Sequence, residues 1–149
     1  MNEPLAALNL LLQRASAERD LALRALRLAQ GNADAAVQQA EQLDQYRQDY
    51  RSRWGGEFAR SGTAQLLTCY QAFGQRLEQV IVMQQTQLGQ AKVRVGNAQQ
   101  AWAARELRVA VVSKLIERRE RERQLQRRRS EQRDSDELAQ RVAQSKSAA

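Results

Sequence analysis

The sequence predicts an all-α protein in which two long helices form an antiparallel coiled-coil hairpin. Alanine supplies 24 of the 149 residues, while Phe, Tyr and Trp together make only 5%, so a thick globular core is not expected. Proline occurs once, as Pro4, which permits long uninterrupted helices. Two stretches carry apolar residues at steps of three and four, the spacing of a coiled-coil seam. At this length we expect one coiled-coil domain over residues 1–149.

The first helix is expected at about residues 5–53. Its narrow apolar stripe covers seven heptads, and twelve of the fourteen stripe positions are apolar. Gly31 lies within this stretch at a cost of roughly 1 kcal/mol relative to alanine, which a seam of this length can absorb. The stripe consists of Leu5, Leu8, Leu12, Ala15, Arg19, Ala22, Leu26, Ala29, Ala33, Ala36, Ala40, Leu43, Arg47 and Tyr50.

The second helix is expected at about residues 63–130, followed by a tail at about 131–149 that is partly helical or disordered. Thirteen of its fifteen stripe positions are apolar. Two successive steps of four, around Leu77, form a local stutter that relaxes the supercoil. The stripe consists of Leu66, Tyr70, Phe73, Leu77, Ile81, Gln84, Leu88, Ala91, Val95, Ala98, Trp102, Arg105, Val109, Val112 and Ile116.

A turn is expected at about residues 54–62, where the chain reads "WGGEFARSG". Gly55, Gly56 and Gly62 are helix stop signals, and Ser61 or Thr63 can cap the second helix. Because the connection is short, the two helices run antiparallel.

This turn sets an expected register between the helices. Tyr46 should face the neighbourhood of Phe73, Leu43 that of Leu77, and Gln39 that of Val80. The scarce aromatic residues then gather in one patch near the turn. Leu5 should face about residue 113, so the chain beyond that point should lack an intramolecular partner.

The formal net charge of +7 favours an anionic partner. Much of the excess lies in "ERRERERQLQRRRSEQR" (117–133), which holds eight arginines and four glutamates. Some of this charge is self-compensating, since Glu117 with Arg121, Arg118 with Glu122 and Arg127 with Glu131 stand four residues apart. The run can therefore be a solvated helix face or a docking segment. Nucleic-acid or lipid binding is a third interpretation, although the run has no aromatic stacking residues.

Several function classes have no support in the sequence. One cysteine and no histidine cannot form a Cys–His nucleophile or a soft metal site, and Gly55-Gly56 lacks the Lys and Ser/Thr of a phosphate-binding loop. We expect no enzyme, no cofactor and no metal. Cys69 is interpreted as incidental, Trp54 as a cover for the turn and Trp102 as a seam residue. No signal sequence and no membrane-spanning run is present, so a cytoplasmic location is expected.

The sequence resembles the FliJ family, small coiled-coil components of the bacterial flagellar type III export apparatus. Three blocks carry the resemblance, in the family's order, from about residue 5 to 143. They are Gln39-x3-Leu43-x2-Tyr46-x3-Tyr50, the stretch "YQAFGQRLEQVIVMQQ" with Tyr70, Phe73 and Leu77, and the ending "DELAQRVAQ" with Asp136-Glu137-x-Ala139.

The resemblance implies a non-enzymatic coiled coil similar to the central stalk of a rotary ATPase. Its partners would be the hexameric export ATPase and the cytoplasmic linker of the export gate's large subunit, with export chaperones as a further candidate. The family's gate-binding surface corresponds to Gln39, Leu43, Tyr46, Tyr50, Phe73, Leu77, Val80 and Gln84. Val80 and Gln84 depart from the family's usual Ala and His. Candidate ATPase contacts are Arg118, Arg119, Arg121, Arg123, Arg127, Arg128 and Arg129.

The expected function is therefore to couple ATP hydrolysis to flagellar protein export at the cytoplasmic face of the inner membrane, with no specific nucleic acid and only peripheral membrane contact. One alternative is the equivalent stalk of a virulence injectisome, and another is a basic nucleic-acid-binding coiled coil. A structural interpretation of the aromatic patch also stays open, because the rings can simply thicken the seam where the helices diverge.

Overall fold

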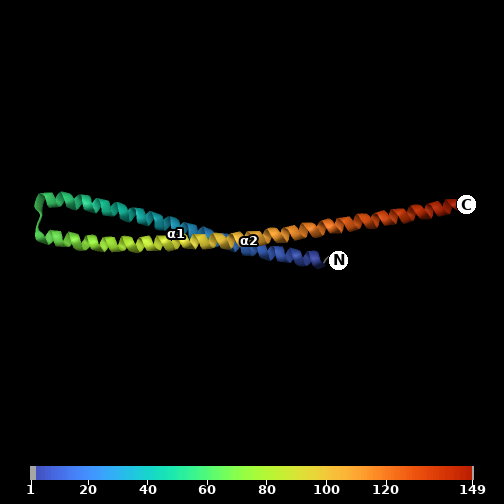
Figure 1. Cartoon of the computed structure of the whole chain (residues 1–149), viewed down its shortest axis with the longest axis horizontal. Helices are drawn as coiled ribbons and strands as arrows, with labels where there is room; N and C mark the ends of the chain where they lie inside the picture. The colour runs from blue at the N-terminus through green and yellow to red at the C-terminus, as the bar shows by residue number, and fades with distance from the viewer. Residues whose placement is uncertain (1–2, 149) are drawn as a thin grey trace. The chain divides into compact units, whose positions relative to one another are not determined.

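The computed structural model describes residues 3–148, apart from the side chains at positions 58, 59 and 61, and it contains two α-helices. Helix α1 spans Glu3–Ser61 and helix α2 spans Ala64–Ser147. No strand occurs among the described residues. The two helices pack against each other in opposite directions as a helical hairpin, which confirms the expected fold class (Figure 1).

The connection between the helices is shorter than the sequence suggested and begins later. The expected turn at residues 54–62 lies mostly inside α1, which continues through Gly55 and Gly56 to Ser61. Neither glycine has a positive φ, so neither adopts the left-handed conformation that would end a helix. Thr63 caps α2, because its Oγ1 accepts a hydrogen bond from the backbone N–H of Leu66 at 3.3 Å.

The C-terminal boundary also differs from the expectation. Helix α2 does not stop near residue 130 but continues to Ser147. Neither proline nor glycine occurs after Gly96, so no residue of this stretch interrupts the helix. Gln132 also donates a hydrogen bond from Nε2 to Asp136 Oδ1 at 3.2 Å, one turn further on.

The contacts between α1 and α2 fall into two units. In the unit Asp20–Ala104, Ala33, Ala36 and Ala91 form a small buried cluster, with Leu88 and Val95 packed against it. Small side chains at these positions let two helix backbones approach closely, as a thin seam requires. Leu26, Leu77 and Ile81 are the other buried apolar residues of this unit.

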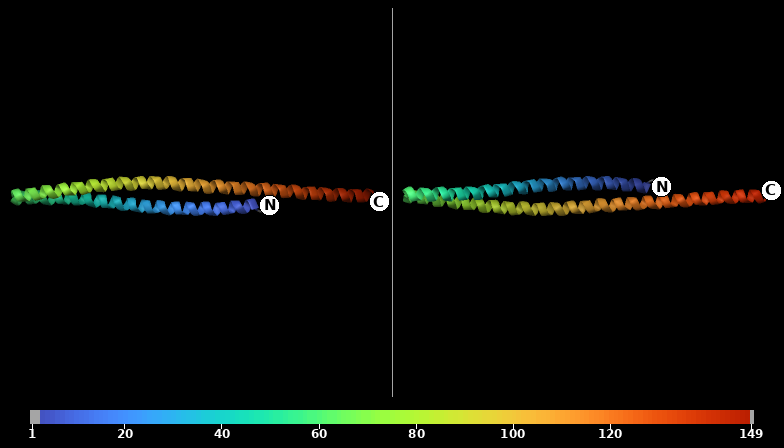
Figure 2. Two further views of the ribbon diagram at one scale, coloured as in Figure 1. Left: turned by 90° about the horizontal axis from the view of Figure 1, so that it is seen from below. Right: turned by 90° about the horizontal axis from the view of Figure 1, so that it is seen from above.

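The other unit comprises the residues up to Arg19 and those from Arg105 onward. Its buried residues are Ala15, Val112 and Ile116. Within this unit α2 continues past the N-terminal end of α1 (Figures 1 and 2).

The expected seam is present in both helices. All fourteen stripe positions of α1 are buried or half-buried. In α2 the same holds for thirteen of the fifteen positions, and the exceptions are Phe73 and Arg105. Neither helix contains an apolar stretch that could span a bilayer. Among residues 3–148, no three His, Cys, Asp or Glu side chains are grouped so that they could hold a metal ion.

The register agrees with the expectation near the connection and departs from it further away. Tyr46 contacts Phe73, as expected. Gln39, however, pairs with Gln84, one turn beyond Val80. Because the connection lies only at residues 62–63, positions of α1 such as Gln39 face later positions of α2 than a turn at 54–62 would give.

The same shift changes the extent of the unpaired end. Residues beyond 113 were expected to lack a partner, yet Ile116 is buried, and Pro4 and Leu5 line a hollow together with Arg119 and Arg123. Gln126 is the last residue of α2 in this hollow. Every residue of 127–148 is exposed. We call residues 127–148 the C-terminal segment.

Candidate functional site: an aromatic surface near the helix connection

Five aromatic rings from both helices meet near the connection and form what we call the aromatic surface. Tyr50 is central, since its ring centroid lies 4.8 Å from that of Phe73, 5.2 Å from that of Tyr70 and 6.0 Å from that of Trp54. The Tyr46 and Phe73 rings meet edge to face at 6.5 Å. Such ring pairs add about 0.5–1.5 kcal/mol each beyond the area they bury.

Tyr50 is held in place by its hydroxyl group as well as by its ring. The hydroxyl donates a hydrogen bond to the backbone carbonyl oxygen of Tyr70 at 3.1 Å, which ties α1 to α2. Burial, and then the neighbouring Tyr70, Tyr46 and Cys69, raise the pKa of Tyr50 above its ordinary value. Tyr50 therefore stabilises the hairpin in its neutral form.

The eight residues that the family resemblance assigns to gate binding differ widely in exposure. Tyr46, Phe73 and Val80 are 51%, 42% and 47% exposed, which leaves them accessible to a partner. Leu77 is buried, and Leu43, Tyr50 and Gln84 are half-buried in the seam. The exposure divides these residues: Tyr46 and Phe73 present an accessible surface, while Tyr50 and Leu77 build the seam beneath it. Gate binding by the exposed residues stays a prediction.

Gln39 and Gln84 join the two helices at one edge of this group. The Nε2 of Gln84 donates a hydrogen bond to Oε1 of Gln39 at 3.1 Å and another to the backbone carbonyl of Ala36 at 3.3 Å. The amide of Gln84 thus has a structural role within the hairpin.

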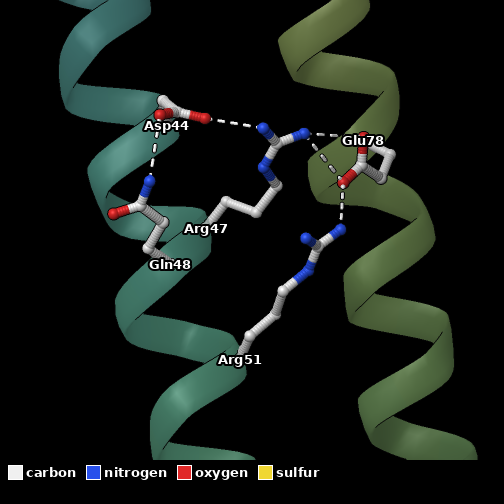
Figure 3. Close-up of polar contacts among 5 residues, drawn as sticks. All are labelled: Asp44, Arg47, Gln48, Arg51 and Glu78. Carbon is white, nitrogen blue, oxygen red and sulfur yellow. Dashed lines mark hydrogen bonds and ion pairs between the residues drawn. The ribbon is translucent and has the colours of Figure 1, made fainter.

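An ion-pair network joins the two helices beside Tyr50 and Tyr70, which line one hollow together with Arg47, Arg51 and Glu78. Glu78 of α2 accepts hydrogen bonds from Arg47 at 3.3 Å and from Arg51 at 3.2 Å, both from α1 (Figure 3). Arg47 also donates to Asp44 at 2.6 Å. The hydrogen bonds to Asp44 and Glu78 raise the pKa of Arg47 above its ordinary value, so its charge is fixed. Its Nε atom is buried without a hydrogen-bond partner in the described part of the chain.

Two open hollows flank the central Tyr50 ring, which lines both. The first, which we call the Gly74 hollow, has a volume of about 620 Å³ and includes Arg47, Arg51, Tyr70, Gln71, Gly74 and Glu78. The second, which we call the Cys69 recess, has a volume of about 500 Å³ and is lined, besides Tyr50, by Tyr46, Asp49, Arg53, Trp54, Cys69 and Phe73. One side of the hairpin is thus ionic, and the other carries the exposed rings.

The seven candidate ATPase-binding arginines are not equivalent in the structure. Arg118 pairs with Glu122 at 3.5 Å and Arg121 with Glu117 at 3.8 Å, as the spacing predicted. Arg119 and Arg123 lie beside the first turn of α1. The remaining three, Arg127, Arg128 and Arg129, lie on the C-terminal segment.

One expected ion pair of this region does not form. Arg127 and Glu131, although they stand one turn apart, make no ion pair with each other among the described residues. Both side chains are exposed, so solvent competes with the pairing, which gains only a few tenths of a kcal/mol.

Two residues of the aromatic surface were absent from the assigned set. Trp54 was interpreted as a cover for the turn, but because α1 continues beyond it, its ring packs on Tyr50 and Tyr70 instead. Tyr70 belongs to the predicted seam and stacks on Tyr50. The spacing Tyr50–Trp54, four residues on one helix face, would have revealed Trp54 had the glycines after it not suggested a turn.

Comparison with known proteins gives one finding. The family model described as flagellar FliJ protein matches residues 4–148, nearly the whole chain. Neither a curated protein nor a solved structure gives a match. With a match of this extent, the chain belongs to the FliJ family of non-enzymatic components of the flagellar protein export apparatus.

Proposed function

We propose that this chain is a stalk-like coupling factor of flagellar protein export. It binds the hexameric export ATPase through its basic C-terminal part and the adjoining start of α1, and it binds the cytoplasmic linker of the export gate's large subunit through the aromatic surface. In this arrangement it links ATP hydrolysis to the entry of export substrates. It works in the cytoplasm at the base of the flagellum and touches the membrane only through the apparatus.

The observation that supports gate binding is the exposure of large rings where the fold does not need them. A thin alanine seam is complete with Tyr50 and Leu77, yet Tyr46 and Phe73 stay about half exposed beside it. Rigid aromatic side chains with accessible faces are the usual anchors of protein interfaces. Val80, also 47% exposed on α2, extends this apolar surface along the hairpin.

ATPase binding is supported by the composition and exposure of the C-terminal part. Arg127, Arg128 and Arg129 are consecutive, exposed and free of ion pairs within the described residues. Three adjacent cations favour an acidic or polar cavity as the docking partner. Since no aromatic side chain interleaves with them, stacking on nucleic-acid bases has no residues to use.

The decisive experiment compares two tyrosine variants in binding to the purified cytoplasmic part of the gate subunit. Tyr46→Ala should lower the affinity about tenfold or more while changing the free energy of unfolding by less than about 1 kcal/mol, because Tyr46 is half exposed. Tyr50→Ala should instead destabilise the hairpin by roughly 2–3 kcal/mol, since it removes a ring packed on three others and a cross-helix hydrogen bond.

Titration calorimetry and thermal melting measure the two effects separately. Unchanged gate affinity in a folded Tyr46→Ala protein would contradict the proposed gate contact. Gln71→Ala is the matched control, because Gln71 lines the Gly74 hollow on the other side of Tyr50.

A further inference from the structure

The Cys69 recess has the features of a subsite that accepts one side chain of a partner. Its walls are the exposed rings of Tyr46 and Phe73, and its lining also includes Trp54. Its volume of about 500 Å³ leaves room for a bulky apolar group. The hairpin supplies no side chain to fill it, and the thiol of Cys69 is exposed there.

Charged groups at the recess add a chemical preference. Asp49 accepts a hydrogen bond from Nε2 of Gln45 at 3.1 Å. Arg53, one turn after Asp49, forms no ion pair among the described residues, although it lines the same recess. A free guanidinium beside an apolar depression favours a carboxylate adjacent to the inserted group.

The Gly74 hollow, on the other side of Tyr50, has neither a free guanidinium group nor exposed aromatic rings. There the guanidinium groups of Arg47 and Arg51 both pair with Glu78, and Arg47 pairs with Asp44 as well (Figure 3). Its rim carries the amides of Gln71 and Gln75 rather than exposed rings. The two sides of the hairpin therefore present different chemistry, and the recess is the one suited to an apolar, acidic segment.

We propose that the Cys69 recess receives a bulky apolar side chain of the export-gate linker, while Arg53 binds a carboxylate next to it in the linker. This rests on the proposed function and deepens it. Asp49, Arg53, Trp54 and Cys69 thereby join the gate-binding surface, which the family resemblance placed on eight other residues. Tyr50 lines both the Cys69 recess and the Gly74 hollow, and it acts as a positioning residue for the rings around it.

The only thiol of the chain permits a direct test, because Cys69 lies in the recess. We expect the rate of Cys69 modification by a small maleimide to fall about tenfold or more when the purified cytoplasmic part of the gate subunit is bound. The control is a Cys69→Ser protein that carries Gln71→Cys on the opposite side, whose labelling rate should change less than about twofold.

The outcomes separate the two proposals. A complex that forms while Cys69 reacts at its free rate overturns the recess and leaves the proposed gate binding intact. If no complex forms with the unmodified chain, the proposed function itself is overturned, and the recess with it.

Two substitutions test the same subsite by affinity. Cys69→Phe fills the recess and Arg53→Glu reverses its charge, and each should weaken gate binding about tenfold or more while leaving the melting temperature within a few degrees. Gln71→Phe and Arg51→Glu are the matched controls in the Gly74 hollow. Wild-type affinity in both recess variants would overturn the inference.

Discussion

Tyr46 and Tyr50 lie four residues apart on α1, but only Tyr50 is a seam stripe position, and the two side chains contribute differently. Tyr50 stacks on Tyr70 and donates its hydroxyl to the backbone of α2. Tyr46 meets only the edge of Phe73 and keeps half of its surface in solvent. A four-residue step advances about 40° further than one full turn, so with Tyr50 in the seam the ring of Tyr46 falls toward its flank. One side chain therefore supports the hairpin while its neighbour is available to a partner.

The raised pKa of Tyr50 gives a pH dependence of stability. A tyrosine whose pKa is raised by folding adds stability below its ordinary value of about 10, and this stability is lost as the pH rises through the folded value. We expect Tyr50→Phe to lose less stability than the wild type between pH 9 and about 11.

Melting temperatures at several pH values measure this difference. At pH 8 the variant should be less stable by about 0.5–1.5 kcal/mol, because the hydrogen bond to Tyr70 is missing. Tyr46→Phe serves as the control and should keep the wild-type profile. Parallel profiles of wild type and Tyr50→Phe would argue against a Tyr50 proton as the cause.

Residue spacing was enough to predict which side chains face the seam. Spacing did not predict, however, which residues of the other helix pair with the polar stripe positions. Arg19 pairs with Glu106, Arg105 with Glu18, Arg47 with Glu78, and Gln84 with Gln39. The partners lie outside the stripe, at positions that come close only for one particular register. The spacing of residues within one helix does not determine how the two helices are aligned, so these pairs could not be predicted.

At the scale of the elements, the continuation of α1 through Gly55 and Gly56 is the largest departure from the sequence prediction. The glycine pair costs roughly 1 kcal/mol per residue in helical conformation. Packing of Trp54 on Tyr50 and Tyr70, just before the pair, offsets part of this cost. Helix propensity considers only a residue and its neighbours along the chain. It therefore misses the contact of Trp54 with Tyr70, which belongs to the other helix.

A substitution at these glycines should therefore stabilise the protein. Nothing lies within 4 Å of where a Cβ would stand on Gly55 or Gly56, so alanine meets no clash. We expect Gly55→Ala to raise the free energy of unfolding by about 0.5–1 kcal/mol, and the double alanine variant by up to twice that.

Denaturant unfolding with helicity as the signal measures this gain. Because the turn lies at residues 62–63, gate affinity should stay unchanged in the double variant. A loss of stability would instead indicate that the chain turns at the glycine pair, as the sequence suggested.

At the scale of the whole chain, the polar seam positions have a common effect. Each of the four forms its pair between α1 and α2, and each pair joins residues that a shift by one turn would separate. An alanine seam alone is nearly uniform and would tolerate such shifts. Polar residues at seam positions are known to specify register at a cost in stability. The four pairs therefore select one alignment of the hairpin.

Fold class, seam and aromatic patch could thus be predicted from the sequence, because each depends on spacing and composition. The length of the C-terminal part of α2 that has no partner on α1 could not be predicted from the sequence. It depends on where the connection lies, and an error of a few residues at the turn moved the expected limit from about residue 113 to Gln126. The exposed recess also required the structure, since Asp49, Arg53 and Cys69 lie outside the stripes.

The corrected limit leads to a prediction for a shortened chain. A protein that ends at Gln126 keeps every residue of the hairpin with a partner on the other helix, because residues 127–148 are all exposed. Its melting temperature should stay within a few degrees of the wild type. Its stimulation of the export ATPase should be lost, because Arg127, Arg128 and Arg129 are missing.

A phosphate-release assay with the purified hexamer measures the stimulation. Replacement of the same three arginines by glutamine is the control that leaves the helix in place, and it should reproduce most of the loss. Full stimulation by the shortened chain would assign ATPase binding to the paired part of the molecule instead.

None of the described side chains is less than 2% exposed, and four of the nine buried core residues are alanines. Unfolding of such a hairpin exposes little additional apolar surface to water. Its heat-capacity increment per residue must therefore fall below the roughly 12–15 cal/mol/K that globular domains show. A small increment flattens the stability curve. A bacterium that swims in cold water and in warm water would accordingly keep this rod folded by a similar margin in both.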